Sequence, residues 1–110
     1  MIFSFKGYTL ITDNGTCVHK NGNWVPKCVK EDVDSVNDCK ETCTSLEDCV
    51  GYFYNLDENR NCRLIVTTNL SNHCPHGYEW KQGNSGRIKS AGDLKANNLP
   101  GWICFAKNHV

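Results

Sequence analysis

The sequence has no surplus of charge, no long apolar run and none of the short motifs that mark the common enzyme classes. Its 12 basic and 12 acidic side chains give a formal net charge of zero, which argues against a dedicated nucleic-acid-binding protein. No apolar run approaches the roughly 20 residues of a membrane-spanning helix. The G-x-S-x-G, H-E-x-x-H and Gly-rich phosphate-binding patterns are absent, so we expect neither catalysis nor a cofactor.

Cysteine is abundant by contrast, because eight of the 110 residues are cysteines. This density is typical of a disulfide-stabilised scaffold, and the even count fits four bridges with no obvious free thiol for a Cys–His nucleophile. Hydrophobic residues make up only 39% of the chain, so the core is modest. We expect a single domain spanning residues 1–110, in a secreted or extracellular protein, where disulfides persist.

Two tripeptides of the N-x-[ST] type agree with that location. Asn14 begins Asn-Gly-Thr and Asn69 begins Asn-Leu-Ser, and we predict both asparagines as acceptors of N-linked glycan. No signal peptide is visible, because the apolar stretch Met1–Phe5 ends at Lys6 and is too short for the apolar core of one. We therefore expect that a leader was removed.

One helix is predicted, from about residue 36 to residue 45. Ser35 can cap its first turn, and Asp38 stands three residues later as in a capping box. Cys39 and Cys43 are separated by four residues, so they lie on the same face of the helix. That face has to be buried if both cysteines are bridged.

Four segments rich in β-branched and aromatic residues predict strands: 8–11, 50–56, 62–66 and 101–106. The polar segment 57–61 would join the second and third of these in a hairpin. Residues 67–100 are rich in Asn, Ser, Gly and Lys. They predict a long loop that Cys74 could pin, containing one short hairpin around residues 82–86.

The central cysteines have the spacing C-x3-C-x5-C-x12-C and are Cys39, Cys43, Cys49 and Cys62. Structural zinc prefers two pairs of the C-x2–4-C type, and only the first two cysteines have that spacing. We therefore predict no metal site. The expected helix and hairpin instead favour the bridges Cys39–Cys62 and Cys43–Cys49, which would fasten one to the other.

The segment SVNDCKETCTSLEDCVGYFYNLDENRNCRLI resembles the core of the PAN/apple domain family. That core has a C-x3-C helix, a short turn, a cysteine leading into an aromatic strand, and a cysteine that opens a C-x-L strand. Residues 101–105 are similar to the last strand of apple-type members. The resemblance implies an α+β fold, in which a curved antiparallel sheet of about five strands surrounds one helix. The matching positions are Cys39, Cys43, Cys49, Tyr52–Asn55, Cys62 and Leu64.

The resemblance also bears on the disulfides. It implies the same two central bridges, and it suggests a bridge between the chain ends, Cys17–Cys104, which leaves Cys28 to pair with Cys74. The alternative of Cys28–Cys104 with Cys17–Cys74 stays open. The presence of an extra cysteine pair and the polar insertion 67–100 depart from the family pattern.

PAN/apple modules bind proteins or carbohydrates, including anionic glycosaminoglycans. The resemblance therefore implies a secreted, non-catalytic recognition or adhesion module. Aromatic rings can stack on sugars and basic groups can pair with sulfate or carboxylate, and exposed loops commonly carry binding sites. We predict that an anionic glycan contacts the aromatic and basic residues of the insertion, unless Trp80 merely packs on the sheet. These residues are Tyr78, Trp80, Lys81, Arg87, Lys89 and Lys95.

Two other functions remain open. Residues 31–58 contain nine acids and one base, a net charge of −8, and residues 59–110 contain seven bases and two acids, a net charge of +5. The acidic helix region or a sheet edge could therefore contact another protein, or a second copy, as part of a larger extracellular protein. A small defence or toxin effector is the other alternative. The neutral charge and the lack of a basic amphipathic stretch argue against membrane insertion.

Overall fold

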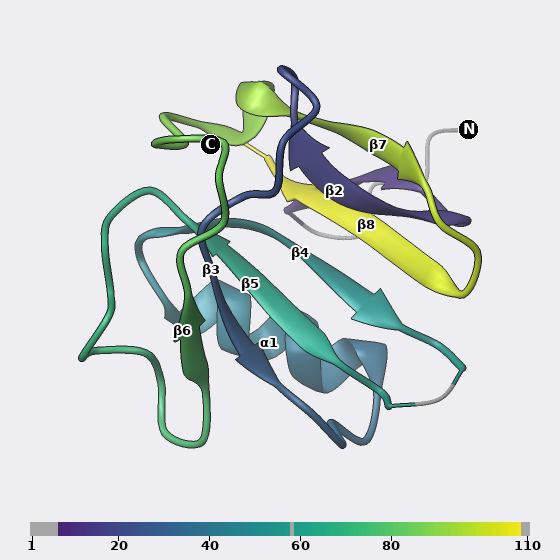
Figure 1. Ribbon diagram of the computed structural model, residues 1–110. Helices are drawn as coiled ribbons and strands as arrows, with labels where there is room; N and C mark the ends of the chain where they lie inside the picture. The colour runs from purple at the N-terminus through teal and green to yellow at the C-terminus, as the bar shows by residue number, and fades with distance from the viewer. Residues whose placement is uncertain (1–6, 58, 109–110) are drawn as a thin grey trace.

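A computed structural model describes residues 7–57 and 59–108 (Figure 1). Within these ranges the protein has an α+β fold with one α-helix, antiparallel strands and four disulfides. The stretch Met1–Phe5, considered above for a leader, lies outside the described residues, as does Glu58 in the predicted hairpin turn. No helix in the described ranges is long and apolar enough to cross a membrane.

The larger sheet has six strands in the order β1-β8-β4-β5-β3-β6, and all neighbours are antiparallel. It is unclosed, because β1 and β6 lie at opposite edges (Figure 1). Its strands are β1 (Tyr8–Thr12), β8 (Trp102–Lys107), β4 (Cys49–Asn55), β5 (Cys62–Val66), β3 (Lys27–Lys30) and β6 (Glu79–Lys81). A separate two-stranded ladder joins β2 (Gly15–His19) to β7 (Leu94–Asn98), which follows the short 3-10 helix η1 (Ala91–Asp93).

The helix α1 (Val36–Ser45) has the predicted bounds. Ser35 caps it as expected, since its Oγ accepts a hydrogen bond from the backbone N–H of Asp38 at 3.1 Å. Cys39 and Cys43 are fully buried on the side of the helix that packs against β4 and β5. The spacing of these two cysteines thus predicts the buried face correctly.

The sheet has a core on each of its faces. On the face covered by α1, the ring of Tyr52 lies 5.3 Å from that of Tyr8 and 5.2 Å from that of Phe105. On the opposite face, Phe53 packs 5.4 Å from the ring of Trp102. Neighbouring residues of a strand point to opposite faces, which explains how the run Tyr52–Tyr54 serves both cores.

Four disulfides connect these layers. Two of them join α1 to the strands beside it, the third joins β2 to β8, and the fourth joins β3 to the loop before β6. The alternative pairing of Cys28 with Cys104 and Cys17 with Cys74 does not occur. The bridges are Cys39–Cys62, Cys43–Cys49, Cys17–Cys104 and Cys28–Cys74.

Two predictions for residues 67–100 are wrong. The segment is not one loop, because Leu94–Asn98 forms β7 and pairs with β2. The hairpin around residues 82–86 does not form either, because β6 pairs with β3 instead. The turn packs on the chain before β3: Asn84 and Ser85 each donate a backbone hydrogen bond of 2.9 Å to the carbonyl oxygen of Trp24. Gly83 has φ +68°, and a Cβ atom there would lie 2.4 Å from that same oxygen, so the close approach requires glycine.

Candidate functional site

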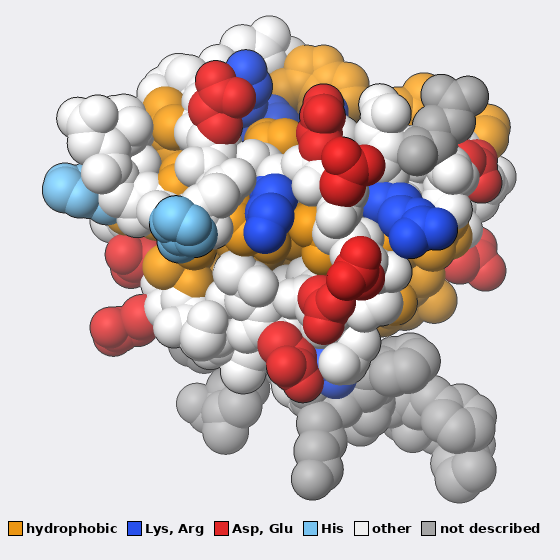
Figure 2. All heavy atoms as spheres, turned by 90° about the horizontal axis from the view of Figure 1, so that it is seen from below, with side chains coloured by type: hydrophobic (Ala, Val, Ile, Leu, Met, Phe, Trp, Pro, Cys, Tyr) orange, Lys and Arg blue, Asp and Glu red, His pale blue; other side chains and the backbone are white. Residues whose placement is uncertain are grey.

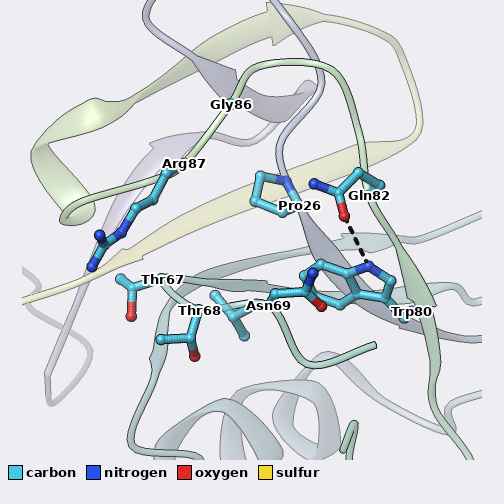
Figure 3. A pocket seen from close by; sticks show the side chains of 9 residues that line it. Pro26, Thr67, Thr68, Asn69, Trp80, Gln82, Gly86 and Arg87 are labelled. Atoms are coloured by element: carbon cyan, nitrogen blue, oxygen red, sulfur yellow. Dashed lines mark hydrogen bonds between the residues drawn. The ribbon is translucent and has the colours of Figure 1, made fainter. Parts of the chain in front are cut away.

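A pocket of about 410 Å³ is lined by the end of β5 and the residues after it, by Pro26 just before β3, and by β6 and the segment that follows it (Figure 3). Its volume falls within the range of about 300–1,000 Å³ common for small-molecule sites. The walls combine one aromatic ring, one cation and several small polar groups. They consist of Pro26, Val66, Thr67, Thr68, Asn69, Trp80, Gln82, Gly86 and Arg87.

Trp80 provides the aromatic wall. It is the middle residue of β6 and is half-buried, with its inner side packed against the core beneath α1. Its indole Nε1–H donates a hydrogen bond of 3.2 Å to Oε1 of Gln82 (Figure 3). Because the nitrogen is already bonded, the surface that the ring presents to the pocket is the apolar one that stacks on other rings.

Arg87 provides the cation. Figure 3 shows its side chain across the pocket from Trp80, extending in the direction of Thr67. Two ion pairs occur among the described residues, Lys20–Asp93 and Lys81–Glu79, and neither includes Arg87. The guanidinium is therefore open to an outside anion, with five donors in a planar fork suited to sulfate or carboxylate.

Polar groups from the chain after β5 form the remaining wall. Thr68 donates a hydrogen bond from Oγ1 to Oδ2 of Asp48 at 2.9 Å. The side chain of Asn69 is exposed, and its Oδ1 accepts a hydrogen bond of 2.9 Å from the backbone N–H of Ser71. This turn occupies the amide oxygen and leaves the Nδ2 group of Asn69 as a donor at the pocket.

The structure brings together two of the six predicted ligand contacts, Trp80 and Arg87. Tyr78 instead packs on the core beneath α1, where its hydroxyl donates to Sγ of Cys62 at 3.3 Å and burial raises the pKa of its phenol. Lys89 lines a separate hollow beside η1, together with Lys107 and Asn108. The last two residues, Lys81 in β6 and Lys95 in β7, are exposed but line neither the pocket nor this hollow.

The sequence did not reveal the other walls of the pocket, which include Thr67, Thr68 and Gln82. These are common surface residues without a motif. Asn69 was singled out only as a glycan acceptor. Cys74 is the one sequence feature that bears on the position of this wall, because its bridge to Cys28 holds the loop before β6 against β3. The residues alone leave two possible partners for Cys74.

A cluster of three basic residues, which the sequence also did not reveal, lies on the sheet face away from α1. Lys27 is opposite Lys81 in the register of β3 and β6, and Arg63 of the neighbouring β5 is opposite Val29, two pairs further along. Lys27 is only 5% exposed, and its Nζ donates to the carbonyl oxygen of Val25 at 2.9 Å. Burial first, and then the charges of Arg63 and Lys81, lower the pKa of Lys27 to about 8.

Arg63 in this cluster packs over aromatic rings. Its guanidinium carbon lies 4.9 Å from the ring centre of Trp102 and 5.7 Å from that of Phe53, within the range of cation–π contacts. Lys27 and Arg63 are therefore packed into this face while Lys81 stays exposed, and none of the three lines the pocket beside Trp80.

The remaining predicted sites are placed as follows. Asn14 is exposed in the turn between β1 and β2, away from the residues that line the pocket, whereas Asn69 lies in the pocket wall. Among residues 7–57 and 59–108, no group of three or more His, Cys, Asp and Glu side chains is arranged to hold a metal ion.

Comparison of the chain with protein-family models, with curated proteins and with solved structures finds no match. The function is therefore inferred from the chemistry of the pocket.

Proposed function

We propose that the protein is a secreted, non-catalytic recognition module that binds an acidic carbohydrate in the pocket between Trp80 and Arg87. One observation carries this proposal: an indole ring whose Nε1–H is bonded to Gln82 and a cation with no ion-pair partner among the described residues line the same pocket. An acidic sugar needs this combination, because its C–H face is apolar while its sulfate or carboxylate requires a charge-assisted partner.

The binding mode follows from the walls. The apolar face of one sugar ring stacks on Trp80, and the acidic group pairs with Arg87 on the far side of the pocket (Figure 3). The Nδ2 group of Asn69 donates to a ring hydroxyl. With a single cation in the pocket and an open rim, the affinity is weak and falls as salt screens the charge.

The fold features that agree with a PAN/apple-type module are one helix packed on an antiparallel sheet and the bridges Cys39–Cys62 and Cys43–Cys49. We propose this relationship, including a sheet that curves around α1, on those features and on the sequence resemblance. Four disulfides in so small a chain are consistent with an oxidising, extracellular location.

A second candidate function is binding of a basic protein through the face that carries α1. Figure 2 views the molecule from below, and acidic side chains form a broken band across this face. Asp34, Asp38 and Glu41 are exposed there, and none takes part in the two ion pairs of the described residues. Such a field would steer a cationic partner rather than an acidic glycan.

A heparin-type affinity column, loaded with protein without glycans, tests the proposed function. We expect retention at low salt and elution as salt is raised. Arg87→Gln should elute earlier, whereas Lys95→Gln removes another exposed cation, from β7, and should change elution much less. Elution of the unaltered protein in the void volume at low salt would rule out the acidic-glycan function.

A further inference from the structure

Asn69 combines two features that no other described residue shares. It begins the glycan-acceptor tripeptide Asn69-Leu70-Ser71, and its side chain lines the pocket beside Trp80 (Figure 3). We propose that Asn69 carries an N-linked glycan whose first sugar fills this pocket, so that glycosylation closes the site to outside carbohydrate. This inference rests on the proposed function in one respect, namely that the face of Trp80 binds a sugar ring.

The acceptor atom is accessible. The Asn69 side chain is exposed, and its Oδ1 is bonded to the backbone N–H of Ser71 at 2.9 Å, which leaves Nδ2 without a hydrogen-bond partner among residues 7–57 and 59–108. In the modification, Nδ2 forms a bond to the anomeric carbon of the first sugar and loses one proton. The bond from that carbon to the diphosphate of a lipid-linked oligosaccharide donor breaks, and the lipid diphosphate leaves. The step is a substitution at the anomeric carbon and involves no oxidation or reduction.

A sugar attached to Asn69 starts at the pocket wall, so its contact with Trp80 is an intramolecular one. Tethering over such a short link corresponds to an effective concentration in the millimolar range or above. An outside sugar that binds weakly and reversibly cannot displace it at lower concentrations. The pocket of about 410 Å³ is open at its rim, so the later sugars of the chain can extend into solvent while the first stays on the indole.

Asn14 provides an internal comparison. It begins the tripeptide Asn14-Gly15-Thr16 and is exposed in the turn between β1 and β2. It does not line the pocket of Trp80. A glycan on Asn14 is therefore not attached to the wall of the pocket. Removing the Asn14 glycan is a matched control for removing the Asn69 glycan.

The experiment uses the full chain secreted from a glycosylating eukaryotic cell line. Ser71→Ala removes the acceptor tripeptide but keeps Asn69 and the backbone N–H that bonds to it, and Asn14→Gln is the control. Mass spectrometry measures occupancy at each asparagine. Calorimetric titration with a sulfated oligosaccharide at low salt then gives the affinity of each form, before and after an endoglycosidase trims the glycans to one sugar.

We expect Ser71→Ala to bind about tenfold more tightly than the unaltered protein or Asn14→Gln. Trimming the glycans to one sugar should leave the affinity of the unaltered protein low, because the first sugar alone fills the pocket. An NMR contact between the acetyl methyl group of that sugar and the indole protons of Trp80 should be present. The proposal is overturned if Asn69 carries no sugar, if Ser71→Ala binds and the unaltered protein binds equally well, or if that contact is missing.

The two proposals fail in different ways. If Ser71→Ala does not bind the sulfated oligosaccharide at all, the proposed function is wrong, while the NMR contact still decides whether the attached sugar lies on Trp80. If Ser71→Ala binds and the glycosylated form binds equally well, the acidic-glycan function stands and the closing of the pocket is contradicted.

Discussion

Cys28 lies directly opposite Trp80 in the register of β3 and β6, and the same cysteine is bridged to Cys74. The strand β6 has only three residues and forms the edge of the sheet. Few backbone hydrogen bonds therefore hold it, and the Cys28–Cys74 bridge fixes the chain just before it. The aromatic wall of the pocket depends on this bridge more than on the ladder.

Removing the Cys28–Cys74 bridge should therefore abolish glycan binding. In Cys28→Ala/Cys74→Ala, we expect the free energy of unfolding to fall by about 4 kcal/mol from the loss of loop closure, and β6 to detach from β3. Cys17→Ala/Cys104→Ala is the control, since it opens a longer loop, of 87 residues against 46. The control should lose at least as much stability in denaturant titrations but keep its affinity, and equal loss of affinity in both would contradict this role.

Lys27 should make the stability rise with pH. Its pKa in the folded protein is about 8, below the ordinary 10.5, so between these values the unfolded chain binds more protons and stability increases with pH. Below pH 8 the penalty is fully present, at roughly 3 kcal/mol. Lys27→Met removes the charge but leaves the carbonyl of Val25 without its donor, which costs about 1–3 kcal/mol.

Denaturant unfolding at pH 7 and pH 9.5 tests this. The free energy of unfolding of the unaltered protein should rise relative to that of Lys27→Met as the pH rises. Lys95→Met, at an exposed position of β7, should differ from the unaltered protein by the same free energy at both pH values. Parallel pH profiles for the unaltered protein and Lys27→Met would show that burial does not shift the pKa of this lysine.

Replacing Thr16 with an apolar residue of the same shape should stabilise the folded protein. Its hydroxyl is buried and has no hydrogen-bond partner among the described residues, so the folded state bears the cost of removing it from water. Thr16→Val keeps the shape, and we expect it to raise the free energy of unfolding by about 1 kcal/mol. The comparison is made in protein without glycans, because Thr16 belongs to the Asn14 tripeptide.

The matched control is Thr12→Val. The Oγ1 of Thr12 accepts a hydrogen bond of 3.1 Å from the backbone N–H of Asn14, so its loss should lower stability slightly rather than raise it. If thermal unfolding instead places Thr16→Val below the unaltered protein, the buried hydroxyl has a partner that stabilises it.

The local signals in the sequence were sufficient for the helix and the central hairpin. Ser35, Asp38 and the spacing of Cys39 and Cys43 act within one or two helical turns, so they set the bounds and the buried face of α1 without help from the rest of the chain. The aromatic run of β4 and the strand that begins at Cys62 likewise form a local pair.

The remaining elements depend on distant partners. β7 has no alternating pattern of apolar residues and becomes a strand only because β2 lies beside it. The predicted turn at residues 82–86 packs against Trp24 instead of closing a hairpin. The same packing separates Arg87, in the pocket, from Lys89, beside η1. Of the six residues predicted to contact a glycan, Trp80 and Arg87 therefore line one pocket, while the sequence could not show that the neighbouring lysines lie outside it.

The most direct test of the central claim compares Trp80→Ala with Trp24→Ala, in protein without glycans, by calorimetric titration with a sulfated oligosaccharide at low salt. Trp24 is also a surface tryptophan, 38% exposed, but it does not line the pocket. We predict that Trp80→Ala loses about tenfold or more in affinity, at least ~1.4 kcal/mol, while Trp24→Ala binds like the unaltered protein. Unchanged binding by Trp80→Ala, or a loss confined to Trp24→Ala, would contradict the account.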